Sequence, residues 1–437
     1  EYKQELRAAG FHAPGRWGQS DAALAFVHLY GFDDAFAGEH RTELSRFVDV
    51  DGPIILGELH PYQQIIRQRI LGHVASTPPQ RALLSLPTGA GKTRVVVEAL
   101  VDALINRSLT GHVVWVADRE ELCEQAVQAW RDIWRWRGTS HTLRIGREWG
   151  GLDGARAPGS PHHRVVVASV QTLRNRVGAT DLSQPWARGA ACIVIDEAHA
   201  STTTSYTAVL AELGLSRGRT TIPLIGLSAT PFRGVDDSPN SETAQLVRRY
   251  DSNRLDDGVF TSNDAHRFLR NGEILSEADF EVVDGITIFP DESELKHFRQ
   301  FRDFSVRLLQ AIGQDHDRTS RIIERIAAID ESWPTLVFAT SVANAEVLAG
   351  LLAARGITAR AISNKTDRVA RRDAIARFRD GTVRVLTNYG VLTTGFDAPK
   401  TRAIVVARPI FSPGLYMQAI GRGLRGPKNG GTDRCLI

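Results

Sequence analysis

The chain has 437 residues, of which 42% are hydrophobic and 24% are charged, and its formal net charge is +3. This is the composition of a globular protein with a sizeable core, and it excludes binding of nucleic acid through bulk charge alone. No apolar run approaches the roughly 20 residues that a membrane span needs. Cys123, Cys192 and Cys435 form no CxxC pair, which argues against a zinc site and favours a reducing cytosol.

The N-terminal segment, residues 1–55, is predicted to be a separate accessory piece that is mostly helical, and the sequence assigns it no function. The chain begins with Glu1 rather than methionine and stops within TDRCLI, which reads as the start of a strand. We therefore expect a fragment of a longer protein.

Residues 56–235 alternate short strand-like runs with helical stretches. The runs are rich in β-branched residues and read ALLSL, HVVWVA, RVVVAS, ACIVID and PLIGLS. Helices are predicted between them, over residues 93–106 and 119–136. Strands that alternate with helices in this way indicate a parallel sheet built from βαβ units.

The segment LPTGAGKT, residues 86–93, follows the first of these strands and opens a helix. It matches the phosphate-loop pattern G-x-x-x-x-G-K-[ST] except that Leu86 replaces the first glycine. Glycines let backbone N–H groups curl around phosphate oxygens, while Lys92 reaches the β- and γ-phosphates and Thr93 offers a hydroxyl to magnesium. The loop, which includes Thr88, Gly89, Ala90 and Gly91, is therefore predicted to bind ATP with Mg²⁺.

The segment IVIDEAH supplies the acids that such a site needs. Asp196 lies where an apolar strand meets solvent, which suits a carboxylate that binds magnesium. Glu197 beside it can polarise a water for in-line attack on the γ-phosphate. An Asp-Glu pair at a strand end is often only a helix cap, but about 100 residues after a phosphate loop the catalytic interpretation is favoured.

The alternation weakens over residues 236–330, which are polar and are predicted to form a connector with accessory helices. It resumes over residues 331–437, with the runs TLVFATS, TARAISN, VRVLTN and TRAIVVARP and helices over 342–355 and 368–379. This second block has no phosphate loop. It ends in MQAIGRGLRG, where a helical spacing places Gln418, Arg422 and Arg425 on one face. Since arginine stays charged and suits phosphoryl oxygens, we expect this face to point across a cleft toward the first block, with Gly421 and Gly423 permitting close approach.

From about Gly57 to its C-terminus, the chain resembles superfamily 2 helicases and translocases. LHPYQQ is similar to their adenine-recognising Q element, with Gln63 as its glutamine. Motifs I, Ia, Ib, II, III, IV, V and VI are matched in order by LPTGAGKT, VADREELCEQ, ASVQTL, DEAH, LSATP, LVFATSVANAEVLAGLL, VLTTGFDAP and YMQAIGRGLRG. The resemblance implies an α/β fold with two tandem RecA-like domains, residues 56–235 and 331–437.

Within this superfamily, the chain looks most like RadD-type DNA repair helicases, and the motor subunits of type I and type III restriction enzymes are close relatives of that type. RNA helicases with a DEAH tetrad normally carry Q-R-x-G-R-x-G-R in motif VI, whereas this chain has Q-A-I-G-R-G-L-R. RadD-type proteins usually continue into a zinc-binding tail, which this chain does not reach.

The resemblance implies roles for the matching residues. Catalysis would fall to Lys92, Asp196, Glu197, Arg422 and Arg425, the two arginines acting as arginine fingers. Nucleotide contacts would come from Gln63, the phosphate loop, Gly395 and Asp397. Coupling between nucleotide and domain movement would involve Ser228, Thr230 and Gln418, and contacts with the nucleic-acid backbone would involve Arg119, Gln171, Thr172, Thr393 and Thr394.

Two further features carry alternatives. The basic runs RWRGTSHTLRIGR and RVARRDAIARFR are candidate strand contacts, but a solvated helix face explains each as well. Trp130, Trp134 and Trp136 could stack on bases. However, Trp130 and Trp134 are four residues apart on a predicted helix, which favours core packing.

The sequence therefore favours an ATP-dependent helicase or translocase that moves on DNA with little sequence specificity, in repair or phage defence. The expected location is a prokaryotic cytosol or nucleoid. The alternatives are a nucleotide-gated binding or scaffold subunit of a larger complex that does not separate strands, and an RNA helicase. A small-molecule kinase with a phosphate loop does not explain the second block.

Overall fold

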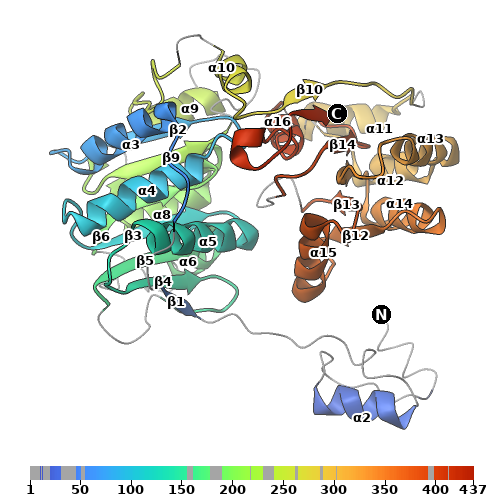
Figure 1. Ribbon diagram of the computed structural model, residues 1–437, viewed down its shortest axis with the longest axis horizontal. Coiled ribbons are helices and arrows are strands. Elements are labelled where there is room, and N and C mark those ends of the chain that lie inside the picture. The colour runs from blue at the N-terminus through green and yellow to red at the C-terminus, as the bar shows by residue number, and fades with distance from the viewer. Residues whose placement is uncertain are drawn as a thin grey trace.

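The computed structural model describes residues 20–30, 46–50, 55–154, 161–177, 189–216, 218–229, 241–260, 264–285, 289–301, 303–391, 398–411 and 413–437, with Gly10 and His12. Two sheets stand side by side, the first built from the N-terminal half of the chain and the second from the C-terminal half (Figure 1). The predicted α/β class with parallel sheets is confirmed. None of the helices described has both the length and the apolar composition to cross a membrane.

The first sheet has seven strands in the order β1-β4-β5-β3-β6-β9-β2. Six strands are parallel, and β1 joins the edge antiparallel to β4. The central strands are continuous apolar runs because helices cover both faces of the sheet. The strands are β1 (Phe47–Val50), β2 (Arg81–Ser85), β3 (His112–Ala117), β4 (Leu143–Glu148), β5 (His163–Ser169), β6 (Ala190–Ile195) and β9 (Leu224–Ser228).

Helices pack on the two faces of this sheet in separate apolar clusters. One cluster holds α3 (Pro61–Val74), α4 (Lys92–Ile105) and α5 (Glu120–Arg137), and the other holds α6 (Val170–Val177), α8 (Thr204–Glu212) and α9 (Glu242–Arg249). Trp130 and Trp134 are fully buried in the first cluster, so core packing is confirmed for both. The remaining elements of this half are α2 (Asp21–Leu29), η3 (Ala198–Thr202), β7 (Leu215–Ser216), β8 (Arg219–Thr220) and α10 (Ala265–Asn271).

A group of buried charges joins α3, α4 and α5. Asp102 accepts hydrogen bonds from Arg67 and from Arg137, whose Nε lies 2.9 Å away. Glu98, which is fully buried, lies 2.8 Å from Arg94 Nε. Because burying a carboxylate is costly unless it is paired, these contacts lock the three helices in one arrangement. They lie behind the phosphate loop, at the C-terminal end of which α4 begins.

The stretch predicted as a connector, 236–330, divides its contacts between the two sheets. Leu83 of β2 donates to Asn253 and accepts from Leu255, and Leu255, Leu269 and Leu275 pack in the core of the first half. From Ser276 onward the chain packs with the second sheet. We therefore propose a boundary near Ser276 rather than a separate connector unit.

The second sheet has six parallel strands in the order β10-β15-β14-β11-β13-β12. The C-terminal run that reads as the start of a strand is β15, which pairs with β10 and β14. The strands are β10 (Glu277–Asp279), β11 (Thr335–Phe338), β12 (Ala359–Ser363), β13 (Val385–Tyr389), β14 (Ala403–Val406) and β15 (Arg434–Leu436).

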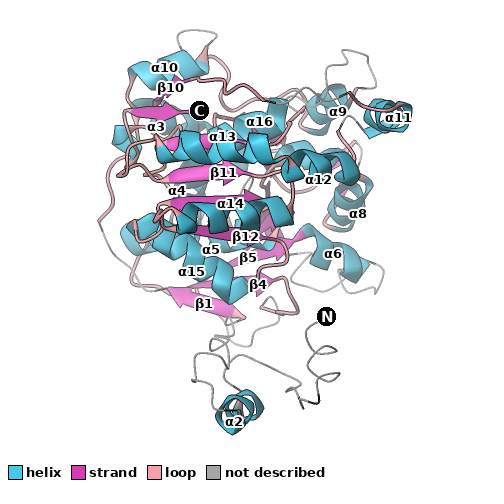
Figure 2. Ribbon diagram, turned by 90° about the vertical axis from the view of Figure 1, so that its right-hand side faces the viewer, coloured by secondary structure: helices cyan, strands magenta, loops and turns pink. Residues whose placement is uncertain are grey.

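Helices also cover both faces of the second sheet. Figure 2 shows the outer face, where α13 (His316–Ala327) and α14 (Val342–Ala354) pack over the strands. On the face toward the first half lie α15 (Arg368–Asp380) and α16 (Pro413–Ile420). The accessory helices predicted within 236–330 include α11 (Glu292–Phe301) and α12 (Val306–Gln314), which are separate because Ser305 caps a new start. A short 3₁₀ turn, η4 (Pro427–Asn429), follows α16.

Candidate active site

The predicted phosphate loop lies between β2 and α4. Gly89 has φ +86° and Gly91 has φ +79°, which is the left-handed conformation that glycine adopts without a steric penalty. Successive residues in such conformations gather backbone N–H groups into a concave nest, and the N-terminus of α4 adds the positive end of its dipole. The loop therefore has the shape and the charge of an anion site.

Lys92 lies at the end of this loop, and its side chain bonds to the backbone of the loop. Its Nζ donates to the carbonyl oxygens of Leu86, at 2.8 Å, and Pro87, at 3.3 Å. Burial lowers the pKa of the Lys92 ammonium, and the carboxylates of Glu197 and Asp196 oppose that shift. The side chain thus donates to carbonyls that phosphate oxygens can replace.

Gln63 lies under the loop and does not line the cleft. Its Nε2 donates to Ala90 O at 3.1 Å, and its Oε1 accepts from His60 N at 3.0 Å. A Cβ added at Gly91 would lie 2.4 Å from that Nε2, so the glycine is needed for this close approach. In this arrangement Gln63 supports the loop, and its predicted contact with adenine stays a prediction.

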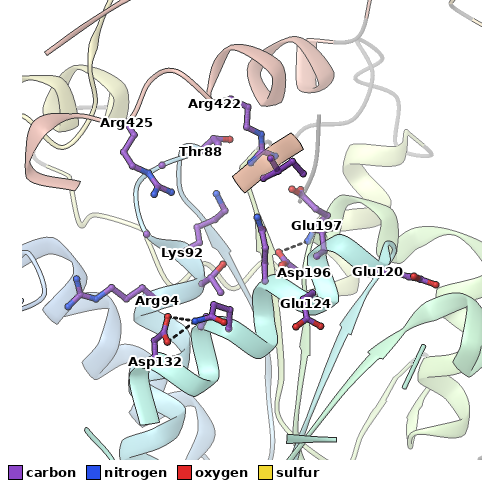
Figure 3. A pocket seen from close by; sticks show the side chains of 18 of the residues that line it. Thr88, Lys92, Arg94, Glu120, Glu124, Asp132, Asp196, Glu197, Arg422 and Arg425 are labelled. Atoms are coloured by element: carbon purple, nitrogen blue, oxygen red, sulfur yellow. Dashed lines mark hydrogen bonds between the residues drawn. The ribbon is translucent and has the colours of Figure 1, made fainter. Parts of the chain in front are cut away.

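The acidic pair lies at the end of β6, opposite Lys92. Asp196 N donates to Val116 O at 2.9 Å, which ties the pair to β3. Glu197 has φ +51°, a left-handed conformation that is uncommon for residues other than glycine. Strain of this kind persists where the surrounding structure enforces it, and it clusters at functional sites. Here it turns the chain sharply so that both carboxylates face the cleft (Figure 3).

The two carboxylates titrate differently. Burial, together with the negative charge of Glu197, raises the pKa of Asp196 to about 7. Burial also acts to raise the pKa of Glu197, but His199, Lys92 and Arg422 hold it below its usual value. His199 Nδ1 lies 3.3 Å from Glu197 Oε2. An acid with a depressed pKa and a neighbour with a raised one is the asymmetry expected of a pair with separate roles.

Both halves of the chain line one cleft of about 690 Å³. The first half contributes Thr88, Lys92, Thr93 and the acidic pair, and the second contributes Arg422 and Arg425, which point into the cleft in Figure 3. The expectation that these arginines continue a helix is wrong, because α16 ends at Ile420. They lie in the turn that follows it, and Arg425 forms a backbone bridge with Leu275.

The two glycines of this turn have different neighbours. A Cβ at Gly421 would lie 2.6 Å from Thr88 Cβ, so this glycine permits close approach to the phosphate loop as expected. A Cβ at Gly423 would instead lie 2.3 Å from Cys435 Sγ, within the second half. Gly423 therefore serves packing of its own domain, contrary to expectation.

Two of the predicted coupling residues contact the site. Gln418 Nε2 donates to Glu197 Oε2 at 3.3 Å, which is a direct contact between the halves. Ser228, at the end of β9, accepts a hydrogen bond from Leu86 N through its carbonyl oxygen at 3.2 Å. The third, Thr230, lies outside the described residues.

The predicted nucleic-acid residues of the first half gather away from the phosphate loop, around Asp118. Gln171 Nε2 donates to Asp118 O at 2.6 Å, and Arg119 Nη1 donates to Gly390 O of the second half at 3.2 Å. Thr172 Oγ1 accepts from Ser169 at 3.0 Å. Four residues of motif V were predicted to contact the nucleic acid or the nucleotide. These residues, Thr393, Thr394, Gly395 and Asp397, lie outside the described residues.

The basic runs have two different placements. In the first run, Arg144 pairs with Asp49 at 3.0 Å and Arg147 with Glu124 at 2.8 Å, so these arginines stabilise the fold. In the second run, Arg371 and Arg379 of α15 line the cleft. The sequence indicated the charge of α15 but not which way it faces. Two further residues contact the site: His199 lies beside Glu197, and Asn429 lies beside Gly89. The DEAH tetrad includes His199, whereas no motif in the sequence indicated Asn429.

The residues present fit ATP and Mg²⁺. The nest and the helix N-terminus suit the phosphates, and Lys92 supplies a cation within it. The hydroxyl of Thr93 and the carboxylate of Asp196 are hard oxygen ligands of the kind that Mg²⁺ prefers. Both line the same cleft.

Comparison with known proteins matches the two halves separately. Residues 56–233 match the family model of the type III restriction enzyme res subunit, and residues 318–426 match the helicase conserved C-terminal domain. A Saccharomyces cerevisiae protein described as the putative ATP-dependent helicase IRC3 is 29% identical over 369 residues, covering 82% of this chain and 48% of the relative. The chain spans about half the length of the curated relatives it matches.

Solved structures share the fold. The ATP-dependent type ISP restriction-modification enzyme LlaBIII bound to DNA has a TM-score of 0.61 and 16% identity, covering 88% of this chain and 28% of that one. Dbp5 of S. cerevisiae bound to RNA and ADP BeF3 has a TM-score of 0.55 and 16% identity, covering 87% of this chain and 88% of that one. The two RecA-like domains implied by the sequence are thereby confirmed.

Proposed function

We propose that this chain, which belongs to superfamily 2 of helicases and restriction-enzyme motors, hydrolyses ATP between its two domains and uses the cycle to move along DNA. One observation carries the proposal. The phosphate loop and acidic pair of the first domain share a single cleft with Arg422 and Arg425 of the second. A site divided in this way works only when the domains come together, so ATP binding would favour closure and hydrolysis would release it.

The side chains have complementary tasks in this cycle. Lys92 would exchange its loop carbonyls for phosphate oxygens. Glu197, which its depressed pKa keeps ionised, would orient the attacking water and accept its proton. Thr93 and Asp196 would hold Mg²⁺, which neutralises phosphate charge when bound. Arg422 and Arg425 would stabilise the charge that develops on the transferred phosphoryl group.

DNA is the proposed track. The restriction-modification enzyme with the same fold is bound to DNA, and motif VI lacks the arginine pattern usual in DEAH RNA helicases. The low net charge supports contacts through backbone amides and hydroxyls, which give little sequence specificity. RNA is the alternative, because Dbp5 with the same fold is bound to RNA.

The biological setting is proposed to be DNA repair or phage defence, with other subunits or domains as partners. The match with a restriction-enzyme res subunit supports the defence setting, and the IRC3 match supports a helicase that acts outside restriction. A location in a prokaryotic cytosol stays a prediction.

The decisive experiment measures ATP turnover with single-stranded DNA, duplex DNA, forked DNA and RNA side by side. We expect stimulation by DNA and loss of turnover in Lys92→Ala. Turnover that is unchanged in Lys92→Ala would refute the site, and stimulation by RNA alone would refute the DNA track.

A strand-displacement assay on forked and tailed duplexes separates the remaining alternatives. Displacement that requires ATP indicates a helicase. ATP turnover without strand displacement indicates either a duplex translocase or a nucleotide-gated subunit. A triplex-displacement assay separates these two, because a translocase displaces the third strand and a nucleotide-gated subunit does not.

A further inference from the structure

Asn429 contacts the phosphate loop from far along the chain. It lies in η4, beyond the arginine segment, and its Nδ2 donates to Gly89 O at 3.0 Å and to Ile274 O at 3.3 Å. Its Oδ1 lies 3.2 Å from Nε2 of His60, within the Q element. The side-chain amide is therefore fully engaged, and it joins three segments that are distant in sequence.

The contact with Gly89 O fixes the direction of one peptide of the loop. In a planar trans peptide the C=O and the N–H point in opposite directions. Because Asn429 holds the Gly89 carbonyl, the N–H of the same peptide, which belongs to Ala90, points the opposite way. It donates there to Pro87 O at 3.1 Å, within the loop. A phosphate oxygen would bind this N–H by replacing Pro87 O as its acceptor.

The next peptide is held in the same manner from another element. Ala90 O accepts from Tyr62 Oη at 2.7 Å and from Gln63 Nε2 at 3.1 Å. The N–H of that peptide belongs to Gly91, the N-cap residue of α4. Two consecutive carbonyls are thus held by outside donors, one from the first domain and one from the segment after motif VI.

Asn429 is itself held in place. Gly426 N donates to Ile274 O at 2.9 Å, and Ser276 Oγ donates to Arg425 O at 2.7 Å. A Cβ at Gly431 would lie 1.8 Å from Arg425 O, which shows how tightly the turn folds back. The segment 425–431 is therefore a docked turn that presents Asn429 to the loop.

We propose that Asn429 is a positioning residue that sets the anion-binding shape of the phosphate loop, so that this shape depends on docking of the segment after motif VI. The inference rests on the proposed function, because it concerns the same nucleotide site. It adds a dependence that motifs I and VI alone do not contain: the loop is complete only when the C-terminal turn is in place.

The test measures equilibrium binding of ATP and of inorganic tripolyphosphate to the full 437-residue chain and to Asn429→Ala. Loss of one hydrogen bond to the loop should weaken both ligands by a similar factor of about three to ten. Asn429→Asp, which keeps the shape but loses the donor, should weaken both at least as much. The matched control is Thr432→Val, which removes a side-chain hydrogen bond to Arg434 O next to the docked turn without touching Gly89, and it should bind both ligands as the parent does.

Three results would overturn the inference. The first is binding of ATP by Asn429→Ala and Asn429→Asp as tight as by the parent. The second is a loss of affinity for ATP alone, which would indicate a contact with the base. A loss of affinity in Thr432→Val as large as that in Asn429→Ala is the third, because it would mean that Asn429 has no specific role. Failure of the parent chain to bind either ligand would instead refute the proposed nucleotide site.

Discussion

Gly421 is one of the points where the second domain touches the phosphate loop. An alanine there would place its Cβ 2.6 Å from Thr88 Cβ, whereas ordinary contacts fall at 3.4–4 Å. Moving the second domain away relieves the contact with Thr88, whereas the contact with Met417 O, at 2.7 Å, lies within the second domain and is relieved only by a shift of the turn itself. We therefore predict that Gly421→Ala disfavours the arrangement in which Arg422 and Arg425 face Lys92.

The size of the effect follows from the cost of overpacking. Inserting one methyl group into a well-packed contact costs about 1–3 kcal/mol. About 2 kcal/mol against the close arrangement corresponds to roughly 30-fold in its population, since 1.36 kcal/mol is tenfold. Turnover should fall by about that factor. ATP binding should fall less, by no more than the factor of about three to ten expected when the contact of Asn429 with Gly89 is lost.

The assay is ATP turnover at saturating DNA, beside equilibrium ATP binding and thermal unfolding. Gly72→Ala is the matched control, because Gly72 is an exposed residue of α3 whose added Cβ meets nothing within 4 Å. That variant should keep full turnover. Gly421→Ala with parental turnover, or with equal losses of binding and turnover, would refute the reasoning.

Three further predictions concern the site and its support. Arg422→Ala or Arg425→Ala should leave ATP binding nearly intact and lower turnover on the order of 10³-fold, measured by single-turnover hydrolysis; an equal loss of binding would mean that the arginines hold the ground state. Gln418→Ala should lower DNA-stimulated turnover about tenfold by removing the contact with Glu197, and Gln418→Glu should be worse because it adds a like charge; equal rates in both variants would contradict this. Asp102→Asn should lower the free energy of unfolding by about 2–3 kcal/mol. This lies at or below the range for fully buried ion pairs, because the arginine partners of Asp102 are partly exposed. An unchanged denaturant midpoint would refute this prediction.

Local sequence determined the elements and the phosphate loop. The runs of β-branched residues became parallel strands because each is short and apolar and is bounded by turns, and helices cover both faces. Gly89 and Gly91 determined the loop because a left-handed backbone admits few other residues. The order of the motifs likewise indicated two domains with one shared nucleotide site, since the arginines had no phosphate loop of their own.

The tertiary structure decided which side chains meet. Spacing placed Arg422 and Arg425 on a helix, but α16 ends at Ile420 and the turn beyond it aims them into the cleft. Charge alone did not separate Arg371, which lines the cleft, from Arg144, which pairs with Asp49. Contacts such as that of Asn429 with Gly89 join residues 340 apart. Local patterns record the conformation of a segment, whereas such contacts depend on how two folded domains are docked.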